Sequence, residues 1–213
     1  QMLDFEQHWR EWWARFGGSF RVARQQPQPR PRAAGERRSV ATFYGVPILT
    51  DRVVFLIDRS VSMARRDTDE GYSRLQAAVK EVLTAAERLP RGTEVNVIAF
   101  GDEVWTWRRR LTTLTATLRR QLERDLTELE PAGGTWLFEG LEAAFADPRV
   151  ETVFVLSDGE PSGGRWTAPD DICRELAVLN KRSRATVHTI AVGTNSPLLA
   201  RIAGEHGGTF VRR

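Results

Sequence analysis

The sequence predicts an α/β fold: a doubly wound, mostly parallel sheet of six strands with one antiparallel edge strand and helices on both faces. Strand and helix patterns alternate from about residue 40 onward, which is the order expected of a parallel sheet with helical crossovers. Residues 53–57 and 152–156 form almost entirely apolar runs, as strands do when helices cover both of their faces. Residues 72–89 carry apolar residues at helical spacing and stop before Pro90, which predicts a long helix.

The other elements follow in order along the chain. Gly101-Asp102 is a turn pair after the second apolar strand, and it predicts that the next strand returns antiparallel as a hairpin. The expected strands are residues 94–100, 104–107, 185–192 and 209–211, and the expected helices are residues 114–129, 137–145, 170–180 and 197–206.

Three segments divide the chain. We expect residues 1–24 to form a Trp-rich helical extension, because residues 3–16 place most of their aromatic residues on one helical face before Gly17-Gly18. Residues 25–39 are rich in proline and arginine and predict a linker. Residues 40–213 form the compact domain. The Trp-rich start resembles the last helix of a helical-repeat array, and this likeness implies a larger parent chain.

Composition excludes several classes of protein. The net charge is only +3 and arginine is spread along the chain, so nucleic-acid binding is not favoured. A single cysteine, Cys173, excludes an internal disulfide. No apolar run approaches the roughly 20 residues of a membrane span, and no secretory segment begins the chain. The missing apolar span predicts a protein without membrane contact. We also expect a cytoplasmic location.

Oxygen-bearing side chains gather in three loops. Asp58, Ser60 and Ser62 directly follow the first buried strand, Thr135 follows two glycines between two helices, and Asp158 follows the 152–156 strand. In an open parallel sheet the loops at the carboxyl ends of neighbouring strands meet at one crevice. Two carboxylates and three hydroxyls are hard donors that suit Mg²⁺, Mn²⁺ or Ca²⁺ rather than Zn²⁺. These five residues are therefore candidate metal ligands, with Mg²⁺ preferred.

These three motifs, in this order, resemble the metal-ion-dependent adhesion site (MIDAS) of von Willebrand factor A (vWA) domains, and the likeness runs from about residue 53 to the end of the chain. It implies an intact MIDAS in which Ser60 and Ser62 contact the metal directly. Thr135 would bind directly or through water as its loop moves, and Asp58 and Asp158 directly or through water. It also implies the family's Rossmann-like sheet with one antiparallel edge strand.

The motif departs from the family pattern at two variable positions. Val61 stands where glycine is frequent, and Arg59 is a large cation beside the site. Residues 51–58 and 190–193 look like those of intracellular bacterial vWA proteins. That likeness implies an adaptor or scaffold role, in some members beside an AAA+ ATPase.

Several residues are expected around the metal. A cation held by neutral hydroxyls and two carboxylates still favours an anionic oxygen from outside, so we expect a protein partner that presents an Asp or Glu. Aromatic residues on loops, where they have no core to join, mark contact surfaces. The expected partner-binding residues are Arg59, Trp136, Glu160, Arg165 and Trp166.

Two other functions remain as alternatives. A Mg²⁺-dependent phosphatase-like hydrolase of the haloacid dehalogenase type needs a second Asp two residues after Asp58, where this chain has Ser60, and serine hydrolysis lacks its nucleophile elbow. We therefore expect no enzyme activity. Nucleic-acid binding through the basic linker and residues 108–110 would show a steep salt dependence.

Overall fold

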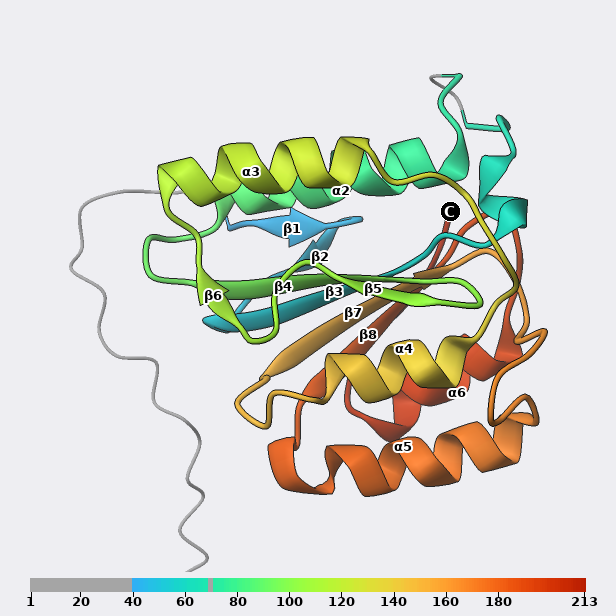
Figure 1. Cartoon of the computed structure of the whole chain (residues 1–213). Coiled ribbons are helices and arrows are strands. Elements are labelled where there is room, and N and C mark those ends of the chain that lie inside the picture. Colours follow the sequence, from blue (N-terminus) through green and yellow to red (C-terminus); the bar gives the residue numbers. More distant parts are fainter. Residues whose placement is uncertain (1–39, 69–70) are drawn as a thin grey trace, which may run out of the picture. The chain divides into compact units, whose positions relative to one another are not determined.

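The computed structural model describes residues 40–68 and 71–213 (Figure 1). The expected N-terminal extension and linker, residues 1–24 and 25–39, lie outside the described residues. In the described ranges seven strands form the main sheet, in the order β5-β4-β3-β7-β8-β9, with the short β6 also paired to β4. The fold is the α/β, mostly parallel arrangement that the sequence predicts.

The strands of the main sheet are β3 (Arg52–Asp58), β4 (Glu94–Phe100), β5 (Val104–Thr106), β6 (Thr112–Thr113), β7 (Thr152–Ser157), β8 (Thr186–Ala191) and β9 (Phe210–Arg212). β3 lies between β4 and β7 and is parallel to both, with Phe55 opposite Val97 on one side and Phe154 on the other. β5 runs antiparallel to β4, as the Gly101-Asp102 turn predicts.

Helices cover both faces of the sheet (Figure 1). They are α2 (Arg74–Arg88), α3 (Ala116–Thr127), α4 (Leu137–Ala144), α5 (Pro169–Ser183) and α6 (Pro197–Glu205), with a short 3₁₀ helix η1 (Val61–Ala64). One core cluster joins the sheet to α2 and α3, and a second joins it to α4, α5 and α6. Because helices bury both faces of the sheet, the sequences of β3 and β7 are nearly continuous apolar runs.

Two small features differ from the expectation. The β1 (Thr42–Phe43) and β2 (Val46–Pro47) hairpin places the buried Phe43 ring 5.1 Å from that of Phe55 and 5.4 Å from that of Phe154. β6 adds an antiparallel pair to Glu94–Val95, so the sheet holds seven strands rather than six. Strands of two residues carry no periodic pattern that a sequence analysis can detect.

Candidate metal centre

The carboxyl ends of β3 and β7 bring the first and third predicted loops together. The two strands pair in parallel up to Ile57 and Leu156, so Asp58 and Asp158 leave the same edge of the sheet. The hydroxyl oxygens of Ser60 and Ser62 lie 3.0 Å apart, and the Ser62 hydroxyl donates to Asp158 Oδ1 at 2.7 Å. Side chains nearly a hundred residues apart thus form one chain of oxygen contacts.

Asp58 is fully buried and meets only neutral donors. The Ser60 backbone N–H donates to its Oδ1 at 2.7 Å, and the Ser157 hydroxyl donates to its Oδ2 at 2.5 Å. Burial raises the pKa of Asp58 above its ordinary value, and the hydrogen bonds from Ser157 and Ser60 oppose that rise only in part. Within the described ranges, no arginine or lysine pairs with this carboxylate.

The loop of Thr135 is tied to the Asp58 loop through the backbone. The Val61 N–H donates to the Gly133 carbonyl at 3.1 Å, and the Ala132 N–H donates to the Arg59 carbonyl at 2.7 Å. Thr135 is buried, and its own N–H donates to the Ser162 hydroxyl at 2.8 Å. The loop therefore lies beside the other ligands, although no hydrogen bond links the Thr135 hydroxyl to the other four side chains in the described structure.

A buried arginine also contacts the site, and the sequence analysis did not identify it. Arg74 is the first residue of α2 and is only 4% exposed. Its Nη1 donates to Asp158 Oδ2 at 2.7 Å, and its Nε donates to Asp67 Oδ1 at 2.9 Å. The Asp67 and Asp158 partners raise the pKa of Arg74 above its usual range, so it remains charged. The capping-box residue Ser73 marks where α2 starts, but not which way the next side chain turns.

Ser157 is a second residue that the sequence analysis missed as a contributor. It directly precedes Asp158, and its hydroxyl both donates to Asp58 and accepts from the Gly159 N–H at 3.3 Å. Its position at the last residue of β7 is the available signal, because that residue shares its edge with the last residue of β3. Ser157 orients Asp58 rather than facing outward.

The donor set fits a hard divalent cation. Two carboxylates and two serine hydroxyls converge, and every one of these atoms is oxygen. No group of three or more His, Cys, Asp or Glu side chains that could hold a metal occurs in residues 40–68 and 71–213. A metal in the described part of the chain would thus depend on hydroxyl ligands, as in the predicted set.

The two predicted tryptophans are partly covered. Trp166 is half-buried and packs against the core cluster beneath α4 and α5, so the premise that it has no core to join was wrong. Trp136 immediately precedes α4 and lies against Gly163, where an added Cβ would collide with the indole nitrogen. Both rings hold the 159–168 loop in place, and their expected contact with a partner stays a prediction.

The charged partner-binding candidates have contacts within the chain. Arg165 pairs with Glu142 at 2.8 Å on the exposed side of α4. Glu160 accepts a hydrogen bond from the Ser196 hydroxyl at 2.8 Å. Arg59 is half-buried and lines a hollow of about 520 Å³ beside Trp105. All three residues lie in loops rather than in helices or strands, and their partner role stays a prediction.

Residues 53–160 match the sequence profile of the von Willebrand factor type A domain. The chain belongs to this family. It is 25% identical over 182 residues to human von Willebrand factor A domain-containing protein 3A, and 27% identical over 163 residues to the human protein 5A. These alignments cover 83% and 73% of this vWA chain but only 14% and 20% of the relatives, so the chain spans a fifth or less of their length.

Solved structures share the fold. A von Willebrand factor type A protein from Catenulispora acidiphila superposes with a TM-score of 0.65 at 22% identity, covering 76% of this chain and 38% of that one. Proximal thread matrix protein 1 from the mussel byssus, described with a zinc-occupied MIDAS motif, gives 0.56 at 22% identity over 75% of this chain and 40% of that one. The intracellular bacterial likeness of this vWA domain stays a prediction. None of the described helices is long and apolar enough to cross a membrane.

Proposed function

We propose that this vWA domain is a metal-dependent interaction module. Asp58, Ser60, Ser62, Thr135 and Asp158 would hold one divalent cation, and the cation would bind an acidic side chain of a protein partner. The contacts from Ser60 to Ser62 to Asp158 carry the proposal, because they gather hard oxygen donors from two distant loops in one place. When bound, the cation supplies a positive centre that recognises anionic oxygen.

The charges of the site support an acidic partner. Asp58 has no cationic partner in the described structure, whereas Asp158 already shares its charge with Arg74. Less than two full negative charges therefore face a divalent cation. A cation with this incomplete compensation and neutral hydroxyl ligands gains from one further carboxylate.

The donor chemistry favours Mg²⁺, with Mn²⁺ or Ca²⁺ as substitutes. The zinc in the MIDAS motif of the mussel protein is a property of that protein, but it supports the idea that this type of site accepts several divalent ions. Hydroxyl and carboxylate oxygens match Mg²⁺ better than they match softer metals.

We further propose binding rather than catalysis. The position two residues after Asp58, where a phosphatase-like enzyme needs its acid, is Ser60, and Asp158 is held by Arg74 and Ser62. Neither carboxylate is free to move a proton. The partner is proposed to be an AAA+ ATPase or another part of a larger parent chain, acting in the cytoplasm.

The first experiment measures Mn²⁺ binding by electron paramagnetic resonance. We expect one bound Mn²⁺ in the wild-type chain, competed by Mg²⁺, and at least about tenfold weaker binding in Ser62→Ala, which lacks one neutral ligand. Ser183→Ala is the matched control, because Ser183 is the last residue of α5 and its hydroxyl donates to the Pro148 carbonyl. A wild-type chain that binds no Mn²⁺ rules out the proposed function.

A second titration tests the acidic partner. A glutamate-rich peptide should tighten Mn²⁺ binding, whereas the same peptide with glutamine in place of glutamate should not. Equal behaviour of the two peptides would show that the metal does not receive a carboxylate.

A further inference from the structure

Contacts on several sides fix the position of Arg74 at the edge of the candidate site. It is nearly fully buried, and its Nε and Nη2 both donate to Asp67, while Nη1 donates to Asp158. Gly193 leaves the necessary room, because a Cβ at this position would collide with Nη2. The backbone of Gly193 has a φ of +65°, which glycine adopts without strain.

The position is unfavourable for an arginine on local grounds. Arg74 lies in the first turn of α2, which has no acidic residue in that turn. The positive end of a helix dipole disfavours a cation there. A nearly buried guanidinium is stable only when carboxylates compensate its charge, and Asp67 and Asp158 are those carboxylates. Arg74 therefore stays at an unfavourable end of the helix dipole because two carboxylates, those of Asp67 and Asp158, compensate its charge.

Arg74 takes up negative charge that a metal would otherwise use. One oxygen of Asp158 accepts from Arg74 and the other accepts from Ser62. Asp67 is about half exposed and compensates the remainder of the guanidinium charge from the outer side. Asp67, Arg74 and Asp158 thus form a row of negative, positive and negative charges that leads from the solvent to the candidate metal ligand.

We propose that Arg74 is a built-in cation that weakens metal binding by sharing Asp158, and that Asp67 limits this effect by neutralising Arg74. This inference rests on the proposed function. A site that contains such a cation binds its metal weakly when no partner is present. It binds the metal more tightly when an anionic group of the partner is bound as well. Arg74 is therefore a positioning residue that makes metal binding depend on the partner.

The two residues predict effects of opposite sign. Arg74→Gln removes the competing charge, so Mn²⁺ affinity should rise about tenfold, equivalent to about 1.4 kcal/mol. Asp67→Asn leaves Arg74 with less compensation, so Mn²⁺ affinity should fall about threefold, the smaller change reflecting solvent screening at an exposed carboxylate. A merely structural role would weaken binding in both variants.

The experiment measures Mn²⁺ binding by electron paramagnetic resonance in the whole chain, with circular dichroism to verify folding. Arg74→Lys keeps the charge and should bind within about threefold of wild type. Arg66→Gln is the control for loss of an exposed positive charge, because among the described residues its side chain donates to the Gly71 carbonyl and not to Asp67 or Asp158. The rise in Tm on adding Mn²⁺ should be larger for Arg74→Gln than for wild type.

The outcomes separate the two proposals. Wild-type binding with equal or weaker binding by folded Arg74→Gln overturns the role of Arg74 and leaves the metal site standing. Should Arg74→Gln be unfolded, unchanged or tighter binding by Asp67→Asn overturns the inference equally. Binding by Arg74→Gln alone supports Arg74 as the competitor and overturns metal binding by the natural chain. No binding by any variant overturns both.

Discussion

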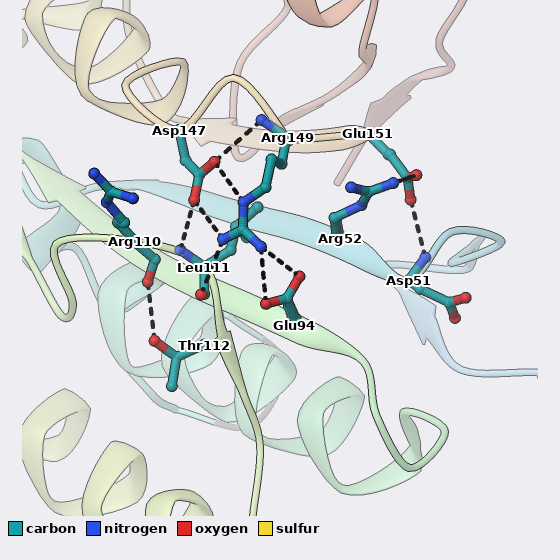
Figure 2. Close-up of polar contacts among 9 residues, drawn as sticks. All are labelled: Asp51, Arg52, Glu94, Arg110, Leu111, Thr112, Asp147, Arg149 and Glu151. Carbon is teal, nitrogen blue, oxygen red and sulfur yellow. Dashed lines mark hydrogen bonds and ion pairs between the residues drawn. The ribbon is translucent and has the colours of Figure 1, made fainter.

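The two ends of the central sheet differ in how their acidic side chains are paired. At the amino ends of the strands, Arg149 donates to Asp147 at 2.8 Å and to Glu94 at 3.0 Å, and Arg52 pairs with Glu151 (Figure 2). At the carboxyl ends, Asp158 also pairs with an arginine, Arg74, but within the described residues the buried Asp58 receives hydrogen bonds only from a hydroxyl and a backbone amide.

The difference separates structural from functional charge. The acids of the amino end are matched by arginines of the same chain, so their contribution is stability. Asp58 carries a desolvated negative charge that no described cation matches, which costs stability in the metal-free chain. An uncompensated buried carboxylate is therefore the feature that indicates an external cation.

Replacement of Asp58 gives the largest effect and is the most direct way to break this comparison. Asp58→Asn keeps an oxygen for the Ser60 N–H but removes the charge. We expect Mn²⁺ affinity to fall at least about 100-fold, while stability in the absence of metal is unchanged or higher because a desolvated charge is gone. Electron paramagnetic resonance and urea unfolding measure the two quantities.

One outcome for the stability of Asp58→Asn would contradict this comparison. If Asp58→Asn unfolds at lower urea than wild type in metal-free buffer, the Asp58 charge stabilises the fold and the contrast between the two ends fails.

The corresponding change at the amino end should reverse the pattern. Asp147 accepts hydrogen bonds from Arg149 and from the Leu111 N–H (Figure 2). Asp147→Asn should lower the free energy of unfolding by about 1–2 kcal/mol at pH 7 and leave Mn²⁺ binding unchanged.

This loss should depend on pH. Hydrogen bonds from Arg149 hold the pKa of Asp147 below its usual value. A lowered folded-state pKa contributes stability above the unfolded pKa of about 3.9 and loses it as pH falls through the folded value. The difference between wild type and Asp147→Asn should therefore shrink below about pH 4, measured by urea unfolding. A difference that is constant down to pH 2 would contradict this origin.

The smallest effect concerns the pair of Arg165 and Glu142, both about half exposed. Arg165→Ala should change the Tm by less than about 2 °C, because exposed ion pairs contribute little. If Arg165 also faces the partner, the affinity for the glutamate peptide should fall about threefold, a size typical of a charge at an interface rim. Calorimetry separates the two, and unchanged peptide affinity would remove Arg165 from the partner surface.

The sequence predicted the parts of the fold that repeat a pattern. β4 has the predicted bounds, because residues 94–100 are mostly apolar and end at a Gly-Asp turn. The convergence of Asp58, Ser60, Ser62 and Asp158 follows from parallel pairing of β3 with β7. Strand order alone determines such an edge.

Other features depend on side-chain directions that no spacing encodes. Arg74 turns toward Asp158 because Gly193, more than a hundred residues later, leaves space there. Trp166 packs against the core cluster of α4, α5 and α6 because its loop is tied to α4, where the Arg165 N–H donates to Glu139. Each depends on a long-range contact, and a single sequence offers no local pattern for such contacts.

The ties between the Asp58 and Thr135 loops run from main chain to main chain, through the N–H groups of Val61 and Ala132. Hydrogen bonds between backbone amides and carbonyls do not depend on which side chain the residue carries. Positions 59 and 61 are therefore free to change chemistry while the spacing of the two loops persists. Varying these two residues offers a route to redirecting what the domain recognises without rebuilding the scaffold beneath.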